Sequence, residues 1–151
     1  MKKPVVFGIG LAILGTAGIV ASYTLGSTPE EPRFDGPLPV CGDAPNCYRV
    51  RRVYSASPDQ VREAARTAIE ASSHWFTGTP DRVADTEDGL TAVFKTGPFS
   101  DDLRIAVVSG AAGQSVLHAR SSSRVGESDL GVNRLRVRRL LAAIHDQLEA
   151  S

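Results

Sequence analysis

The sequence predicts an α+β fold, a two-layer sandwich in which two helices cover one face of an antiparallel sheet, in the order β-α-β-β-β-β-α. Two segments repeat apolar residues at three- and four-residue steps, as amphipathic helices do. Several shorter segments alternate apolar and polar residues around hairpin turns, which favours an antiparallel sheet with one buried face. Helices gathered on that face bury the apolar side of both layers, and 151 residues suffice for one such domain.

The N-terminal segment predicts a single membrane-spanning helix ahead of this domain. Pro4–Leu25 holds no charged residue over 22 positions, long enough to cross a bilayer core. Lys2 and Lys3 precede it, so residues 1–3 are expected in the cytoplasm and the domain outside. A cleaved signal peptide, cut near Val20–Ser22, is the alternative, but its apolar region is usually shorter than this one.

A linker is expected at residues 26–39, because four prolines and two glycines there extend the chain and resist packing. Residues 40–151 form the predicted extracytoplasmic domain. Cys41 and Cys47 open it, and outside the cytoplasm such a pair can form a disulfide. Free buried thiols are the second interpretation. A metal centre would need further ligands nearby, so neither a metal nor a cofactor is expected.

The first strand and helix have clear local signals. Tyr48–Tyr54 is predicted as a half-exposed strand. Ser57 can cap a helix whose first turn holds Pro58 and Gln60, which completes a capping box. The apolar face of this helix consists of Val61, Ala64, Ala65, Ala68 and Ile69.

Four strands follow in two hairpins. Arg82–Thr86 and Leu90–Thr96 flank an Asp-Gly pair, a strong hairpin signal. Leu103–Ser109 and Ser115–Ser123 flank a Gly-rich turn. Because side chains alternate between the faces of a strand, the neighbouring carboxyl groups of Asp101 and Asp102 are expected on opposite faces if a strand carries them.

The last helix is predicted from about Leu130 to Glu149. Its apolar stripe consists of Val137, Leu140, Leu141, Ile144 and Leu148. Arg134, Arg138 and Arg139 are expected on the other side, with Arg136 beside them. The order of elements resembles both the TATA-binding-protein-like fold and a shortened helix-grip fold, and helix-grip proteins hold apolar ligands between the sheet and the last helix.

The start of this helix is the best candidate for a binding site. Gly126 and Gly131 allow close backbone approach, and Ser128 or Asp129 can cap the helix. Free N–H groups together with nearby guanidinium groups suit an anion. The candidate ligand-binding residues are Arg120, Ser123, Arg124, Ser128, Asp129, Asn133 and Arg134. The alternative is structural: Asp129 only caps the helix, and Arg120 or Arg124 only pairs with Asp101 or Asp102.

A family resemblance enters with these residues. RSSSRVGESDLGVNR (Arg120–Arg134) resembles the RSASRVGYSDLGVNR signature of the family called domain of unknown function 1499. CGDAPNC (Cys41–Cys47) resembles its CPDSPNC opening, and FKTGPFSDDLRI (Phe94–Ile105) resembles its segment in which an aromatic residue and an Asp-Asp pair precede a strand. The resemblance covers roughly Leu38 to Ile144 and departs from the signature at Ser122 and Glu127. It implies no activity, because none is established for the family.

The sequence therefore favours a non-enzymatic binding module for an anionic or amphiphilic small molecule, anchored to the membrane. A protein-interaction module of a cell-envelope assembly is the alternative. No nucleophile elbow, metalloprotease motif or phosphate-binding loop is present, and no catalytic residue is assigned. The equal numbers of basic and acidic residues suggest no nucleic-acid partner, although six arginines between Arg120 and Arg139 predict a local basic face.

Overall fold

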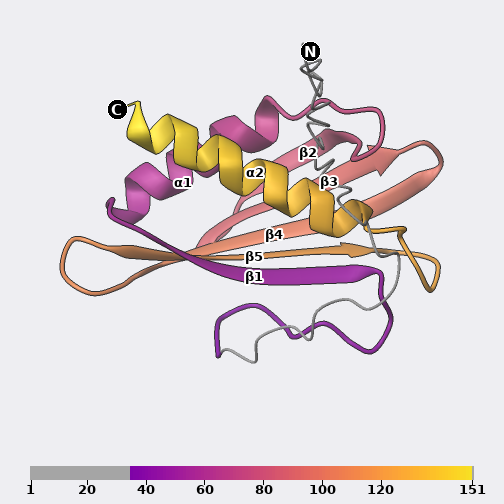
Figure 1. The fold of residues 1–151 in the computed structure, drawn as a ribbon, viewed down its shortest axis with the longest axis horizontal. Coiled ribbons are helices and arrows are strands. Elements are labelled where there is room, and N and C mark those ends of the chain that lie inside the picture. The colour runs from indigo at the N-terminus through magenta and orange to yellow at the C-terminus, as the bar shows by residue number, and fades with distance from the viewer. Residues whose placement is uncertain (1–34, 151) are drawn as a thin grey trace, which may run out of the picture.

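The structure of the protein, a computed structural model, describes residues 35–150. Residues 1–3, the predicted anchor at 4–25 and most of the linker at 26–39 lie outside that part. The elements are β1 (Cys47–Tyr54), α1 (Pro58–Glu70), β2 (Thr79–Asp85), β3 (Gly89–Thr96), β4 (Phe99–Ser109), β5 (Ser115–Ser123) and α2 (Val132–Glu149) (Figure 1). No helix within residues 35–150 is long and apolar enough to cross a membrane.

The five strands form one antiparallel sheet in the order β1-β5-β4-β3-β2. The strands β2 to β5 follow one another as a meander, and β1 joins the free edge of β5. Both helices lie on one face of this sheet (Figure 1). The predicted α+β class, with a five-stranded antiparallel sheet and two helices, is confirmed.

The first helix begins as its sequence predicts. Ser57 accepts a hydrogen bond from the backbone N–H of Gln60, and the Gln60 side chain accepts one from the backbone N–H of Ser57, so the capping box is complete. All five apolar residues predicted for its inner face are buried. Alanines on that face let α1 pack close to the sheet and to α2.

The core lies between the helices and the sheet. Alternate residues of the strands supply it from below, among them Phe94, Leu103, Ile105 and Leu117, which are almost wholly buried. Four of the five residues predicted for the apolar stripe of α2 are buried above them, and Leu148 is partly buried. The core therefore holds α2 firmly along most of its length.

One predicted boundary was wrong in a way that matters for the site. The strand β4 begins at Phe99, because Gly97 turns the chain with φ 57° directly after β3. Asp101 and Asp102 therefore lie inside the strand. Asp101 faces the helices and is 3% exposed, whereas Asp102 is half-buried on the opposite face.

The prediction that Arg136 lies beside the exposed arginines of α2 was also wrong. Its side chain is 1% exposed and points into the sheet. Periodicity assigned this position to the polar side because the residue is charged. The core accepts the charge because a carboxylate and several oxygens meet it there.

The sheet face away from the helices, here called the open face, is partly covered by residues 35–46. This segment runs below β1 in Figure 1, away from the helices. A Cβ at Gly36 would lie 2.6 Å from Nδ1 of His118, so only glycine permits this approach. The predicted disulfide between Cys41 and Cys47 is confirmed. It joins the loop before β1 to the first residue of β1.

Candidate functional site

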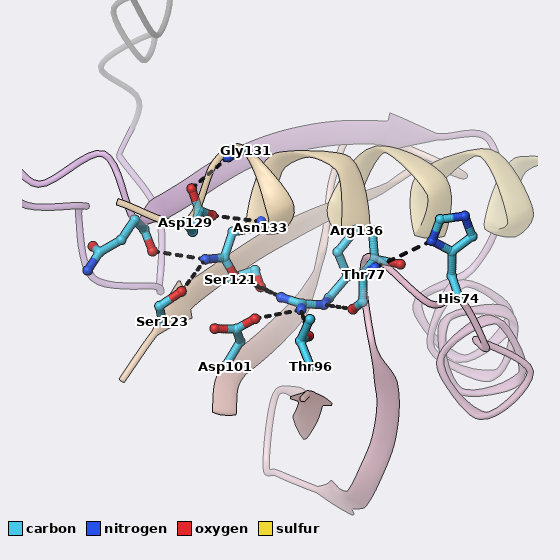
Figure 2. Close-up of polar contacts among 11 residues, drawn as sticks. His74, Thr77, Thr96, Asp101, Ser121, Ser123, Asp129, Gly131, Asn133 and Arg136 are labelled. Carbon is cyan, nitrogen blue, oxygen red and sulfur yellow. Dashed lines mark hydrogen bonds and ion pairs between the residues drawn. The ribbon is translucent and has the colours of Figure 1, made fainter. Parts of the chain in front are cut away.

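The buried guanidinium of Arg136 organises the polar contacts on the helix side of the sheet (Figure 2). Nη2 lies 2.6 Å from Oδ2 of Asp101, and Nε donates to the carbonyl oxygen of Thr77 at 2.9 Å. Nη1 donates to Oγ of Ser121 at 2.9 Å and to Oδ1 of Asn133 at 2.8 Å. One side chain from α2 thus joins β4, β5 and the loop before β2.

An aromatic ring completes the environment of this group. The guanidinium carbon of Arg136 lies 4.7 Å from the centre of the Phe94 ring, a cation–π contact. Burial lowers the pKa of Arg136, while the hydrogen bond and charge of Asp101 act in the opposite direction. A buried ion pair gains little over an apolar core, but loss of one partner leaves an uncompensated charge. All three guanidinium nitrogens of Arg136 are already bound by groups of the protein, so the arrangement is a structural centre.

Asn133 extends this network to the N-terminal loop. Its Oδ1 accepts a hydrogen bond from Ser121, and its Nδ2 donates to the carbonyl of Asn46 at 2.9 Å and to Oγ of Ser123 at 3.0 Å. Asn133 is wholly buried. All four contacts of its amide, counting the one from Arg136, are made to the protein itself.

The start of α2 is capped from outside the helix. Gly131 is the N-cap, with φ 82° and no side chain to cap the first turn. Asp129 does this instead: its carboxylate accepts from the N–H groups of Gly131 and Asn133, and its carbonyl accepts from that of Val132. The N–H groups that the sequence suggested for an anion are therefore already bound by Asp129.

Arg124 and Asp102 form an ion pair on the open face. Nε of Arg124 lies 3.0 and 3.1 Å from the two carboxylate oxygens, and Nη2 lies 2.7 Å from one of them. The hydrogen bond to Asp102 and its charge raise the pKa of Arg124. Because two nitrogens of Arg124 bind the carboxylate, the positive charge of Arg124 balances the negative charge of Asp102.

A pocket with a volume of about 400 Å³ lies next to this pair on the open face. Arg120 reaches it from β5, with Nη1 2.8 Å from Oγ of Ser122. Its buried Nε has no hydrogen-bond partner among residues 35–150. The pocket is lined by Arg82, Thr91, Ala92, Val93, Asp102, Leu103, Arg104, Arg120 and Ser122.

The strand register concentrates positive charge here. Arg120 of β5 stands directly opposite Arg49 of β1 on one side and Arg104 of β4 on the other. Arg82 of β2 reaches the same pocket from the far strand. In the described part of the chain, Arg82 and Arg104 have no acidic partner, and the single acid of the lining, Asp102, is held by Arg124.

His118 lies on the same face of β5 as Arg120, two residues before it in the chain. It is opposite Arg51 and is 3% exposed. Burial lowers the pKa of His118, and the charges of Arg49 and Arg51 lower it further. Protonation of the imidazole is therefore disfavoured beside these arginines. No group of histidine, cysteine or carboxylate side chains within residues 35–150 is arranged to hold a metal ion.

The predicted ligand-binding residues thus divide between two faces. Ser123, Asp129 and Asn133 meet at the start of α2, whereas Arg120 and Arg124 lie on the open face. Ser128 accepts a hydrogen bond from the N–H of Leu130, and Arg134 is half-buried on α2.

Sequence reasoning missed three arginines of these two groups, namely Arg82, Arg104 and Arg136. Arg104 lies between the apolar residues Leu103 and Ile105, and this alternation places it on the face away from the core. Only the register between β4 and β5 shows that it meets Arg120 there.

Comparison with known proteins gives a family and a distant structural likeness. No curated protein matches the chain. Among solved structures, it is similar to the crystal structure of TTHA0849 from Thermus thermophilus, with a TM-score of 0.41 and 8% identity, over 69% of this chain and 97% of that chain. A likeness at this level says nothing of function. Residues 37–144 match the family described as "Protein of unknown function (DUF1499)", so the chain belongs to that family.

Proposed function

We propose that the protein is a membrane-anchored, extracytoplasmic binding module for a small anionic molecule, and that the ligand lies on the open face of the sheet. The observation that carries the proposal is the pocket in which Arg82, Arg104 and Arg120 converge while its only acid, Asp102, is already paired. Guanidinium groups recognise carboxylate and phosphate with paired hydrogen bonds.

The arginines of the open face repel one another. Like charges directly opposite one another on neighbouring strands destabilise a sheet. Arg120 and Arg104 stand in this position, and the buried Nε of Arg120 has no partner in the described part of the chain. An anion between them would relieve the repulsion and accept that hydrogen bond, so ligand binding would also stabilise the fold.

The pocket also suits a ligand with a short apolar part. Val93, half-buried on the same face, lies beside the arginines together with Thr91. A volume of about 400 Å³ is in the range of small-molecule sites. The proposed ligand class is therefore a carboxylate or phosphate ester with a small apolar group.

We infer that the domain belongs among TATA-binding-protein-like or shortened helix-grip folds, from its β-α-β-β-β-β-α order. Ligands of helix-grip proteins lie between the sheet and the last helix. In this chain Phe94, Leu140 and Ile144 occupy that space, which is why the proposal places the ligand on the opposite face.

Two features support the proposed location of the domain outside the cytoplasm, next to the membrane. The Cys41–Cys47 disulfide is the kind of bond that persists in oxidising compartments. The uncharged stretch Pro4–Leu25, preceded by Lys2 and Lys3, is the expected anchor with its N-terminus in the cytoplasm.

The test is native mass spectrometry of the full chain released from its membrane, followed by titration with phosphate, citrate and a short-chain phosphatidic acid. We expect an anionic adduct, or a rise in melting temperature with one of these probes. Arg104→Ser with Arg120→Ser should abolish either signal. Arg138→Ser with Arg139→Ser removes the same charge from exposed positions of α2 and is the matched control.

An equal loss in the control pair would show that only bulk charge matters. No adduct and no response to any probe would contradict the proposal.

A further inference from the structure

Large apolar side chains are exposed together at one end of the domain. We call this group the apolar tip. Its members and their exposed fractions are Trp75 86%, Leu130 76%, Val125 59% and Phe99 56%. A monomeric soluble domain rarely gathers exposed side chains of this size, and such a group usually marks a surface that contacts something apolar.

The pairing of strands and loops brings the segments that carry these residues to the same end of the sheet. Phe99 begins β4 opposite Thr96, the last residue of β3. The N–H of Arg124, the residue before Val125, donates at 3.1 Å to the carbonyl of Ser100, the residue after Phe99, so the two segments lie side by side here. Figure 1 shows the β3–β4 turn, the segment between β5 and α2, and the loop between α1 and β2 at the end of the sheet where α2 begins.

Trp75 and Leu130 belong to the last two of these segments. Trp75 lies in a loop held at both ends: His74 pairs with Gly78, and the carbonyl of Thr77 is bound by Arg136. The Trp75 ring is therefore presented to solvent from a fixed support.

Leu130 is exposed in spite of backbone strain. Its φ is 52°, and it is the only described residue other than glycine with a positive φ. The left-handed conformation is unfavourable for a residue with a side chain, because Cβ then crowds the following carbonyl oxygen. The N–H of Leu130 donates to Oγ of Ser128, and the N–H of the next residue, Gly131, donates to Oδ1 of Asp129, which holds the turn in place. An apolar side chain kept both strained and solvated points to a use outside the free domain.

We propose that the apolar tip docks on the surface of the lipid bilayer to which the chain is anchored. This inference rests on the anchor of the proposed function. Only nine residues separate Leu25 from Asp35, so the domain would begin within about 35 Å of the end of the anchor. Tryptophan and phenylalanine favour the membrane–water interface, where aromatic and aliphatic side chains leave water without crossing the bilayer.

Burial rather than charge drives this contact. The exposed charges near the tip, Lys95 near the end of β3 and Glu127, are of opposite sign, and Arg124 is paired with Asp102. The contact should therefore depend little on the anionic content of the membrane. The arginines of the open-face pocket lie on the side of the sheet away from the helices, whereas the tip lies on the helix side. The pocket therefore stays clear of the lipid.

Trp75 is the only tryptophan of the chain and reports on the contact directly. The full chain would be reconstituted in phosphatidylcholine vesicles, with and without phosphatidylglycerol, using lipids brominated on the acyl chain. We expect blue-shifted Trp75 emission that bromine quenches in both compositions. Phe99→Ser with Leu130→Asn should remove more than half of the quenching, since asparagine tolerates the left-handed backbone. Val53→Ser, at an exposed apolar position at the other end of β1, should leave it unchanged.

The outcomes separate the two proposals. A chain that floats with the vesicles while Trp75 stays open to aqueous iodide would overturn docking and leave the anchor standing. A chain that does not float with the vesicles would overturn the anchor and docking with it. Dimers that dissociate in the tip variant, without bromine quenching, would assign the tip to a second copy and overturn the lipid contact. If bromine quenches Trp75 emission but no anionic adduct is found, the result would count against the anion pocket and leave the lipid contact standing.

Discussion

The two faces of the sheet treat arginine in opposite ways. On the helix side, Arg136 is 1% exposed and surrounded by a carboxylate, three other oxygens within 2.9 Å and an aromatic ring. On the open face, Arg104 and Arg120 stand opposite one another and share a pocket whose only acid is already paired. The donors of Arg136 all find acceptors within the protein, whereas the arginines of the open face offer more hydrogen-bond donors than the protein has acceptors there.

The difference shows how one motif serves two purposes. Arg120–Arg134 contributes Ser121, Asn133 and Asp129 to the closed network, and Arg120 to the open pocket on the other face. Alternation along β5 makes this division, since consecutive residues point to opposite sides. Substitutions should therefore separate into those that unfold the domain and those that leave it folded without a ligand.

The largest effect is expected at the closed network. Asp101→Ala leaves the guanidinium of Arg136 buried without its counter-charge, which should lower the free energy of unfolding by about 3–5 kcal/mol. Urea denaturation of the variant measures this. Asp102→Ala, one residue away on the open face, removes the carboxylate of an exposed pair and should cost only a small part of that. Equal losses at the two positions would contradict the contrast between the faces.

The second effect concerns the loop that connects the two faces. The Cys41–Cys47 disulfide closes a short loop, and Asn46 within it accepts from Asn133 on the helix side. Cys41→Ser with Cys47→Ser should lower the free energy of unfolding by about 2 kcal/mol, as the chain-entropy estimate for a loop this short gives. Denaturation of the oxidised and reduced wild type is the control, and the reduced wild type should match the variant.

A third effect is dependent on pH and belongs to the open face. Burial and the nearby charges of Arg49 and Arg51 lower the pKa of His118 in the folded state. The unfolded chain then binds the proton more readily, so this contribution to stability is complete above about pH 6.5 and is lost as the pH falls through the folded pKa. His118→Gln should flatten the dependence of the unfolding free energy on pH between 7.5 and 5, because the group whose folded pKa is depressed is then absent. An unchanged slope would assign the pH dependence to the carboxylates.

The fold was accessible from the sequence because its signals are local. The capping box at Ser57, the Asp-Gly hairpin before Leu90 and the alternation in β4 and β5 each act within a few residues. The beginning of β4 at Phe99 was missed because Asp101 and Asp102 look like loop residues until partners across the sheet are known.

The site was less accessible because its chemistry depends on long-range pairing. The motif residues Asn133 and Asp129 were identified, but their partners, such as Asn46, are far away in the chain. Arg136 was predicted to be solvent-exposed because its partner, the Asp101 carboxylate, is distant in sequence and the residues around Arg136 do not indicate it. The meeting of Arg104 and Arg120 follows from strand register alone, which a single sequence does not reveal.

The smallest effect on stability is the most informative about function. Arg104→Ser removes one of two like charges that face each other across β4 and β5, so the free energy of unfolding without ligand should stay level or rise by roughly 0.2–1 kcal/mol. The same variant should lose the stabilisation by anionic probes that we expect of the wild type. Melting curves with and without phosphate or citrate, read beside those of Arg138→Ser, measure both quantities. A variant that is destabilised without ligand would mean that Arg104 holds the sheet together as Arg136 holds the core, and the contrast between the faces would fail. A variant that is stable but no longer responds to anions would show that this charge is kept at a cost to the fold, for the sake of what it binds.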